Sequence, residues 1–257
     1  LAAFSNAASS HVVEMDDLDR TSISHPGAPI IATALAVAEE INASFDELIE
    51  SIAIGYEVGI RTGESLGTSH YQNWHTTGTA GTMGSVATAC RLYKLDISQT
   101  INALGTAGTM ASGLWQFLED GAMSKQLHPA KAAHDGILAA KLSRESFTGA
   151  KKIYEGKKGL LNSMSKNPDI ENMTNNLYNI DLIPELWKIN YVSFKVHASC
   201  RHTHAAVDAA IILSQKIDVS EIDNIEVQIY SQALDLLDGM EPISPWAAKF
   251  SLPFCVA

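Results

Sequence analysis

Apolar residues recur at helical intervals in the first part of the chain. Residues 30–41 are rich in Ala, Ile, Val and Leu. The next run carries an apolar residue every four positions, at Leu48, Ile52, Tyr56 and Ile60. This spacing puts the apolar side chains on one face of a helix, which predicts that the face is buried. Ser44 and Glu47 have the spacing of a capping box, so we predict one helix over 30–41 and another from Ser44 to about Leu66.

Two later stretches, 76–95 and 98–117, are crowded with Gly, Ala, Ser and Thr. Small residues three and four positions apart let helix backbones approach closely, so we predict two tightly packed central helices. The alternative is that some of these glycines mark irregular backbone around a ligand. Pro129, directly after His128, is typical of a first helical turn and predicts a further helix to about Leu142.

The pattern changes in the second half of the chain. Residues 162–179 are polar and rich in Asn, which indicates an exposed connection with a short helix. Residues 190–197 and 222–230 alternate apolar and polar side chains as strands do, and a helical run lies between them over 203–216. This β-α-β order predicts a second domain that starts near Pro184.

Composition and charge narrow the function classes. The 257 residues include 18 Lys and Arg against 29 Asp and Glu, a formal net charge of −11. Nucleic acids and anionic membranes need a basic surface, so we expect neither as a partner. No apolar run has the length of a membrane span, and the start lacks a signal-peptide pattern. Cys90, Cys200 and Cys255 are too far apart for a disulfide framework, so we expect a cytoplasmic protein.

Nine histidines gather near the ends of the predicted elements. Histidine titrates near neutrality, so these junctions are candidate acid, base or ligand positions; the alternative is that most are cap or surface residues. The acidic run after His11 resembles a magnesium-diphosphate motif, but Arg20 stands where that motif needs another Asp. His202 and His204 could bind one zinc ion only if they lie on a strand, where residues two positions apart share a face. On a helix their side chains point in nearly opposite directions, and one ion cannot reach both. We therefore predict no metal site.

Lys125 and His128 lie just before the N-terminus of a predicted helix. Free backbone N–H groups and the helix dipole favour an anion at such a position, and cationic or proton-donating side chains strengthen that preference. This stretch is a candidate carboxylate site. The alternative is a basic patch that offsets the negative charge of the chain.

Eight short motifs follow one another along nearly the whole chain: His11-x-x-Glu14-x-Asp16-Asp17, His25-Pro26-Gly27, Gly55-Tyr56-Glu57-Val58, Trp74-His75-x-Thr77-Gly78, Lys125-x-x-His128-x-x-Lys131-Ala132-Ala133-x-x-Gly136, Phe147-Thr148-Gly149, Lys195-x-His197-x-x-Cys200-Arg201-x-x-His204-x-x-x-Asp208 and Lys249-Phe250-Ser251-Leu252-Pro253. Together they resemble the MmgE/PrpD family, which includes 2-methylcitrate dehydratases, cis-aconitate decarboxylases and iminodisuccinate epimerases. Each motif alone is weak. Their order along the chain is what supports the resemblance to the family, and it does not identify one substrate.

The resemblance implies a mainly α fold. A large all-helical domain over 1–183 would be followed by part of a smaller α/β lid domain over 184–257, with the active site between them and a homodimer built on the helical part. Chains of the family are longer, and this one opens at Leu1 and closes on an apolar segment. We therefore expect an excerpt that lacks the family's first helices and the end of its lid.

The resemblance also implies the site residues. The family's active-site positions fall on His25, His75, Lys125 and Lys195, which we expect to be catalytic, with His75 as principal acid and base and His25 as its partner or orienter. The expected substrate-binding residues are Glu14, Asp17, His128 and Arg201.

The implied chemistry acts on a carbon beside a carboxylate. Charge builds up on that carboxylate when the proton leaves, so lysines must stabilise it while a histidine takes or gives the proton, and no cofactor is required. We expect a cofactor-independent lyase, a dehydratase of a small di- or tricarboxylic acid of the 2-methylcitrate type. The alternatives are an isomerase, epimerase or decarboxylase of the same family, or a non-catalytic carboxylate-binding protein.

Phe254 departs from the family pattern, because decarboxylases and many relatives have tyrosine at the matching position. Phenylalanine has no hydroxyl with which to position substrate or relay a proton. If that hydroxyl serves decarboxylation, this protein should be poor at the reaction. The alternative is that Phe254 only packs in the core.

Overall fold

The computed structural model describes residues 1–237 and 241–257 and is mainly α, as the sequence predicts. Its α-helices are α1 (Ala2–Val12), α2 (Gly27–Ile41), α3 (Phe45–Tyr71), α4 (Thr76–Leu92), α5 (Ile97–Met110), α6 (Gln116–Glu119), α7 (Leu127–Arg144), α8 (Leu160–Met164), α9 (His204–Ser214), α10 (Ser231–Leu237), α11 (Pro245–Ala248) and α12 (Leu252–Val256). Its 3-10 turns are η1 (Met123–Gln126), η2 (Ile170–Met173), η3 (Leu177–Asn179), η4 (Pro184–Leu186), η5 (Lys188–Tyr191), η6 (Arg201–Thr203) and η7 (Val219–Glu221). The strands are β1 (Asp17–Leu18) and β2 (Ser193–Phe194).

The chain forms two compact units. The first comprises Leu1–Val12, Asp16–Trp115 and Lys125–Phe194, and the second comprises Val13–Met15, Gln116–Ser124 and Lys195–Ala257. Among the described residues, no helix combines the length and the apolar character needed to cross a bilayer.

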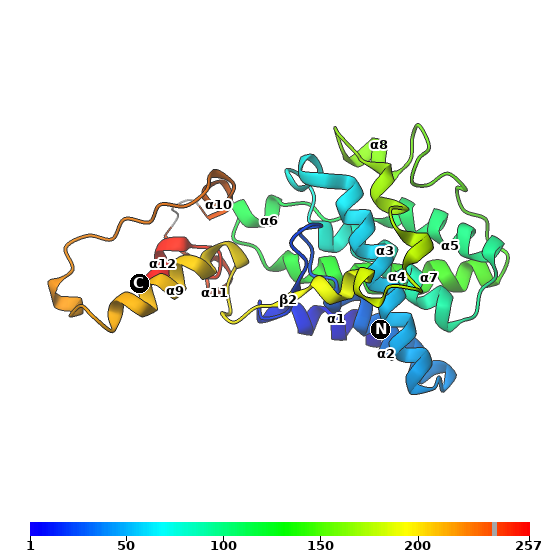
Figure 1. The fold of residues 1–257 in the computed structure, drawn as a ribbon, viewed down its shortest axis with the longest axis horizontal. Coiled ribbons are helices and arrows are strands. Elements are labelled where there is room, and N and C mark those ends of the chain that lie inside the picture. The colour runs from blue at the N-terminus through cyan, green and yellow to red at the C-terminus, as the bar shows by residue number, and fades with distance from the viewer. Residues whose placement is uncertain (238–240) are drawn as a thin grey trace. The chain divides into compact units, whose positions relative to one another are not determined.

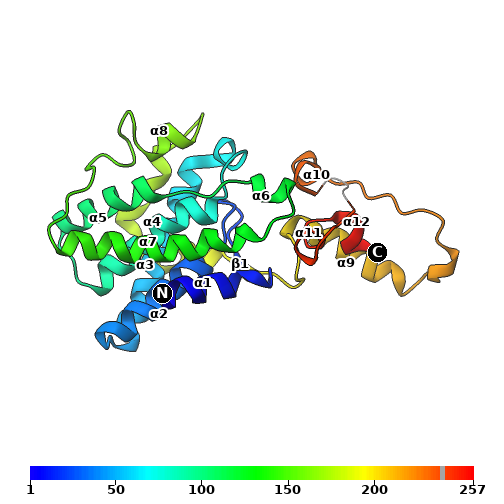
Figure 2. The same ribbon diagram turned by 180° about the vertical axis from the view of Figure 1, so that it is seen from behind.

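Helix α4 is the central helix of the first unit and contacts α2, α3, α5 and α7 (Figure 1). Nearly all of its side chains are buried. The same helices surround it when the molecule is seen from behind (Figure 2). The small residues explain this placement: a Cβ on Gly136 of α7 would lie 2.6 Å from the Ser85 Cβ of α4. The prediction of tightly packed central helices is confirmed for α4, because its backbone approaches α7 more closely than larger side chains allow.

The predicted capping box is also present. The Ser44 side chain accepts a hydrogen bond from the Glu47 backbone N–H, and the Glu47 carboxylate accepts one from the Ser44 backbone N–H. Helix α3 therefore starts where the sequence predicts, with two of its free N–H groups satisfied. The stretch 98–117 is only partly helical, because α5 ends at Met110 and the backbone at Gly113 adopts a φ of 150°.

The strand predictions are mostly wrong. Of 190–197, only Ser193–Phe194 is a strand, and it pairs antiparallel with Asp17–Leu18 inside the first unit. Residues 222–230 form no strand, because a strand needs a partner for its backbone N–H and C=O groups and none of the described residues pairs with this segment. The predicted helix between them is confirmed as α9. In the second unit, Ala233, Leu237 and Leu252 form a small apolar cluster.

Candidate active site

His25 is fixed at the start of α2 by contacts from both its backbone and its ring. Its backbone N–H donates to Thr77 Oγ1 at 3.0 Å, and its Nδ1 lies 2.7 Å from the Asp17 carbonyl oxygen. A carbonyl can only accept, so the proton is on Nδ1 and the neutral ring presents Nε2 as an acceptor. The Asp17 backbone thereby sets the tautomer of His25.

The Asp17 carboxylate closes the same turn. It accepts hydrogen bonds from the Gly27 N–H at 2.9 and 3.1 Å and from the Tyr56 hydroxyl at 2.7 Å. Burial raises the pKa of Asp17 to about 6, although these hydrogen bonds oppose the shift. A Cβ on Gly27 would lie 2.8 Å from this carboxylate, so only glycine allows the approach. In this structure the predicted substrate-binding Asp17 holds the N-terminus of α2.

His75 and His128 share a hydrogen bond in the interior of the first unit. His75 precedes α4, as predicted, and its Nδ1 lies 2.9 Å from Nδ1 of His128 in the first turns of α7. Its backbone N–H donates to the Gly113 carbonyl at 2.9 Å, and a Cβ on Gly113 would lie 3.3 Å from the His128 ring. One of the two Nδ1 atoms must carry the proton between the rings.

Burial dominates the electrostatics of this pair. It holds the pKa of His75 well below its usual range, and the neighbouring His128, Lys125, His11 and His25 lower it further. Burial likewise lowers the pKa of His128 to about 4, with His11 and Lys125 adding to the shift. Both rings are therefore neutral at neutral pH.

Lys125 lies in η1, directly before α7, and only 4% of it is exposed. Its positive charge contributes to the lowered pKa of both His75 and His128. A buried cation at this position raises the potential around the pair and favours a negatively charged ligand.

His11 and Asp16 also belong to this cluster, although no role was predicted for either. His11 Nδ1 lies 2.5 Å from Asp16 Oδ2, and the His11 ring centre is 5.1 Å from that of His25 and 5.8 Å from that of His75. The signal in the sequence is the motif His11-x-x-Glu14-x-Asp16-Asp17, but only the folded loop brings His11 against His75. Trp115 is a further neighbour, with its ring centre 4.8 Å from that of His75.

His11, Asp16 and His25 are the residues of the described chain that could hold a metal ion, since one ligand atom of each lies within 4.8 Å of the others. The existing contacts compete with that use. His11 Nδ1 is bound to the Asp16 carboxylate and His25 Nδ1 to the Asp17 carbonyl. A metal ion at either nitrogen would displace the hydrogen bond that orients the ring.

Glu14, Lys195 and Arg201 lie in the second unit. Lys195 follows β2, and its Nζ is 2.6 Å from Glu14 Oε2, with both side chains almost fully buried. Glu14 adopts a left-handed φ of 61°. Arg201 opens η6 with an exposed side chain, and its charge contributes to the lowered pKa values of His202 and His204, after the larger effect of burial. Each of the three thus lies near a charged or titratable neighbour of its own unit.

Five of the eight predicted site residues therefore lie in the first unit, namely Asp17, His25, His75, Lys125 and His128, and the other three in the second. Chemically, the first unit offers neutral imidazoles that can accept or pass on a proton, beside a buried ammonium group that stabilises an anion.

Comparisons of the sequence with known proteins cover both units. The sequence model of the MmgE/PrpD N-terminal domain matches residues 1–173, and that of the MmgE/PrpD C-terminal domain matches residues 197–257. A cis-aconitate decarboxylase of Aspergillus terreus is 25% identical over 275 residues, which cover 100% of this chain and 56% of the relative. The cis-aconitate decarboxylase-like protein oryM of Aspergillus oryzae is 25% identical over 225 residues, or 81% of this chain and 45% of the relative. The chain spans about half the length of the curated relatives it matches.

Proposed function

Because the chain belongs to the MmgE/PrpD family, we propose that it carries the proton-transfer groups of a cofactor-independent lyase. The proposed reaction is dehydration of a small di- or tricarboxylic acid of the 2-methylcitrate type. The observation that carries the proposal is the hydrogen bond between His75 and His128 beside the buried ammonium of Lys125. Neutral bases next to a fixed cation are what removal of a proton beside a carboxylate needs.

The shared proton gives His75 two states. When His75 Nδ1 donates to His128, Nε2 of His75 is unprotonated and acts as the base that takes the substrate proton. When His128 donates instead, Nε2 of His75 carries a proton and acts as an acid. Once Nε2 has taken the substrate proton, transfer of the Nδ1 proton along the 2.9 Å hydrogen bond leaves a neutral His75 protonated on Nε2 and moves the positive charge to His128, and the reverse transfers restore the first state. Lys125 stabilises the charge that develops on the substrate carboxylate, and His25 is assigned the second proton position, at Nε2.

Lys195 and Arg201 are proposed to bind and orient substrate carboxylates, and Glu14 is proposed to be a further substrate-binding residue. Lys195 already holds one carboxylate, that of Glu14, at 2.6 Å, so its site fits a carboxylate in size and charge. We expect Lys195→Met to raise KM more than it lowers kcat if the lysine only binds substrate. The division into a helical domain over 1–183 and a lid domain over 184–257 is part of the same proposal.

A second candidate reaction is decarboxylation, which the two relatives named after cis-aconitate decarboxylase favour. Against it stands Phe254, which offers no hydroxyl. Epimerisation uses the same proton abstraction and is distinguished by its product. A carboxylate-binding protein without catalysis is the remaining alternative.

Proton exchange tests the proposal. The full protein is incubated in deuterated water with methylcitrate, citrate, cis-aconitate or iminodisuccinate, and NMR follows the α-proton signal and the products. We expect exchange with at least one acid and a loss of about 10²- to 10⁴-fold in His75→Asn. His134→Asn is the matched control, because His134 is half exposed on α7 and binds the neighbouring Asp135.

Two results would contradict the proposal. Equal exchange in wild type and His75→Asn would remove His75 from the reaction. Saturable binding of an acid without any exchange would assign the protein to the non-catalytic binding class.

We also propose a cytoplasmic homodimer that forms through the helical part. Light scattering coupled to size exclusion measures the mass of the particle directly, and the mass of a single chain would overturn the dimer.

A further inference from the structure

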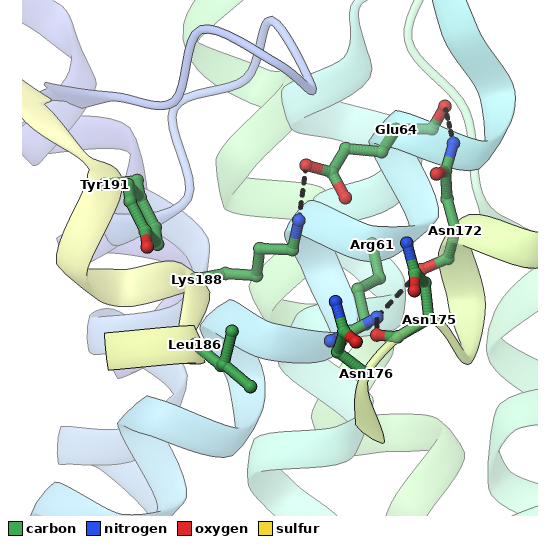
Figure 3. Close-up of a pocket in the computed structure, with 8 residues that line it drawn as sticks. All are labelled: Arg61, Glu64, Asn172, Asn175, Asn176, Leu186, Lys188 and Tyr191. Atoms are coloured by element: carbon green, nitrogen blue, oxygen red, sulfur yellow. Dashed lines mark hydrogen bonds and ion pairs between the residues drawn. The ribbon is translucent and has the colours of Figure 1, made fainter. Parts of the chain in front are cut away.

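A polar cavity of about 210 Å³ lies in the first unit, between α3 and the segment that carries η2 to η5 (Figure 3). It shares no residue with the histidine cluster. Its walls include Arg61 and Glu64 from α3, and Asn175, Asn176 and Lys188 from the later segment. Nothing in the proposed reaction uses these side chains.

Arg61 has hydrogen-bond donors that no acceptor of the described residues engages. Its Nε donates to Glu57 Oε1 at 2.6 Å, and its Nη1 donates to the carbonyls of Asn172 and Asn175 at 2.9 and 2.8 Å. A guanidinium has five N–H groups, so these bonds leave the two on Nη2. Within residues 1–237 and 241–257, Nη2 makes no hydrogen bond, although only 4% of the side chain is exposed. Nη2 is not one of the fully buried side-chain atoms that lack a partner, so its two N–H groups are accessible to an acceptor in the cavity.

The charges around the cavity favour an anion as that acceptor. Arg61 and Lys188 line it with two positive charges, against one carboxylate from Glu64. That carboxylate is engaged by Lys188 Nζ at 2.7 Å and by the Thr21 hydroxyl at 2.7 Å. The Glu57 carboxylate binds Arg61 Nε and the Lys188 backbone N–H and does not line the cavity. The charged side chains that line the cavity therefore sum to +1, and each of the two cations is paired with one carboxylate, Arg61 with Glu57 and Lys188 with Glu64.

We propose that this cavity binds a small oxyanion, a carboxylate or phosphate group, on Nη2 of Arg61. Lys188 also lines the cavity, with its ammonium turned to Glu64, and Figure 3 shows the side chains of Asn175 and Asn176 beside the guanidinium. Arginine suits this role because its planar donors match the oxygens of both groups. The site is separate from the proposed lyase site, so the test of one proposal does not depend on the other.

Calorimetric titration of the full protein with inorganic phosphate and, separately, acetate tests the site, with chloride at the same ionic strength as reference. We expect saturable binding of at least one anion beyond the chloride reference. Binding of phosphate alone or of acetate alone identifies which group the cavity takes. Saturable binding of neither overturns the proposal.

Two variants locate the binding. Arg61→Lys keeps a cation but removes Nη2, and we expect it to weaken binding about tenfold or more. Asn176→Asp adds a carboxylate at an exposed wall position and leaves the Arg61 hydrogen bonds intact, so it tests the site even if Arg61→Lys fails to fold. Asn179→Asp, exposed and outside the cavity wall, is its control. The proposal is overturned if Asn176→Asp and Asn179→Asp bind the anion equally well.

Discussion

Burial determines what the histidines of the first unit can do at neutral pH. The pKa of His128 falls to about 4, and that of His75 lies well below its usual range, mainly because both rings are shielded from water. Such a ring is always available to accept a proton but holds it weakly. The protonated state must therefore be stabilised by the developing negative charge of the substrate or relieved by transfer to the neighbouring ring. This is why we assign the pair, and not His75 alone, to the proton transfer.

Substitution of Lys125 tests the electrostatic part of the mechanism. Lys125→Met removes the buried ammonium, and we expect kcat/KM for α-proton exchange to fall by about 10²- to 10³-fold. Lys125→Arg keeps the charge with altered geometry and should lose less. Lys141→Met is the control, because it removes the same positive charge from an exposed ion pair with Glu40. Equal losses in the Met and Arg variants would show that shape, not charge, matters at this position.

Phe254 tests the choice between dehydration and decarboxylation. Its side chain is 59% exposed in α12, so the structure does not place it in a core. We expect the wild type to release carbon dioxide from cis-aconitate slowly and Phe254→Tyr to release it faster, because tyrosine supplies a hydroxyl. The assay is carbon dioxide release by the full protein. Rapid release by the wild type, unchanged by the substitution, would contradict the argument.

At the scale of elements, glycine decides how closely the helices around α4 approach. Sequence alone predicts α4 from small residues at three- and four-residue spacing and α7 from Pro129 in its first turn, because both are local patterns. It fails for 222–230, because alternation shows only that a segment suits a sheet and not that a partner strand exists. It also fails at the end of α5, where Gly113 turns the backbone toward His75 and His128. That turn serves contacts with residues distant in sequence, which no local pattern records.

A matched pair of substitutions measures the close approach. Gly136→Ala would place a Cβ 2.6 Å from the Ser85 Cβ and 2.7 Å from the Val86 backbone nitrogen, so we expect a loss of about 1–3 kcal/mol in the free energy of unfolding. Gly59→Ala meets its nearest atom at 3.4 Å, and alanine favours the helix, so this variant should be neutral or up to about 1 kcal/mol more stable. Urea unfolding measures both. Similar free energies for the two variants would contradict the packing argument.

At the scale of the molecule, the candidate site depends on contacts that cross long stretches of sequence. The family motifs single out His25, His75 and Lys125, and the first unit brings them into one cluster. They do not reveal the contact between His75 and His128, which are 53 positions apart, or the contacts of the His11 ring with those of His25 and His75. Such contacts follow from the packing of α7 against both α1 and α4. The residue types therefore indicate the chemistry, whereas only the folded structure shows which of these side chains contact one another.

The buried histidines should also make the stability of the whole molecule depend on pH. His70 illustrates the sign: its ring bonds the Met164 carbonyl and the Thr79 hydroxyl, and burial lowers its pKa from 6.5 to about 4. Between these values the unfolded chain binds the proton and the folded chain does not. The stabilisation is therefore present above pH 6.5 and is lost as the pH falls toward 4. His75 and His128 act in the same direction. Asp17, whose pKa is raised from 3.8 to about 6, acts in the opposite direction over that lower range.

We therefore expect the free energy of unfolding to fall between pH 7 and pH 5, with His70 accounting for about 2 kcal/mol of the loss. Glutamine can replace both hydrogen bonds of His70 but does not titrate, so His70→Gln should be less sensitive to pH by that amount, whatever its stability at pH 7. The half-exposed His134→Gln should keep the wild-type dependence. Urea unfolding at the two pH values gives the comparison. If His70→Gln loses as much stability as wild type on acidification, His70 is charged in the folded protein and burial does not set its titration.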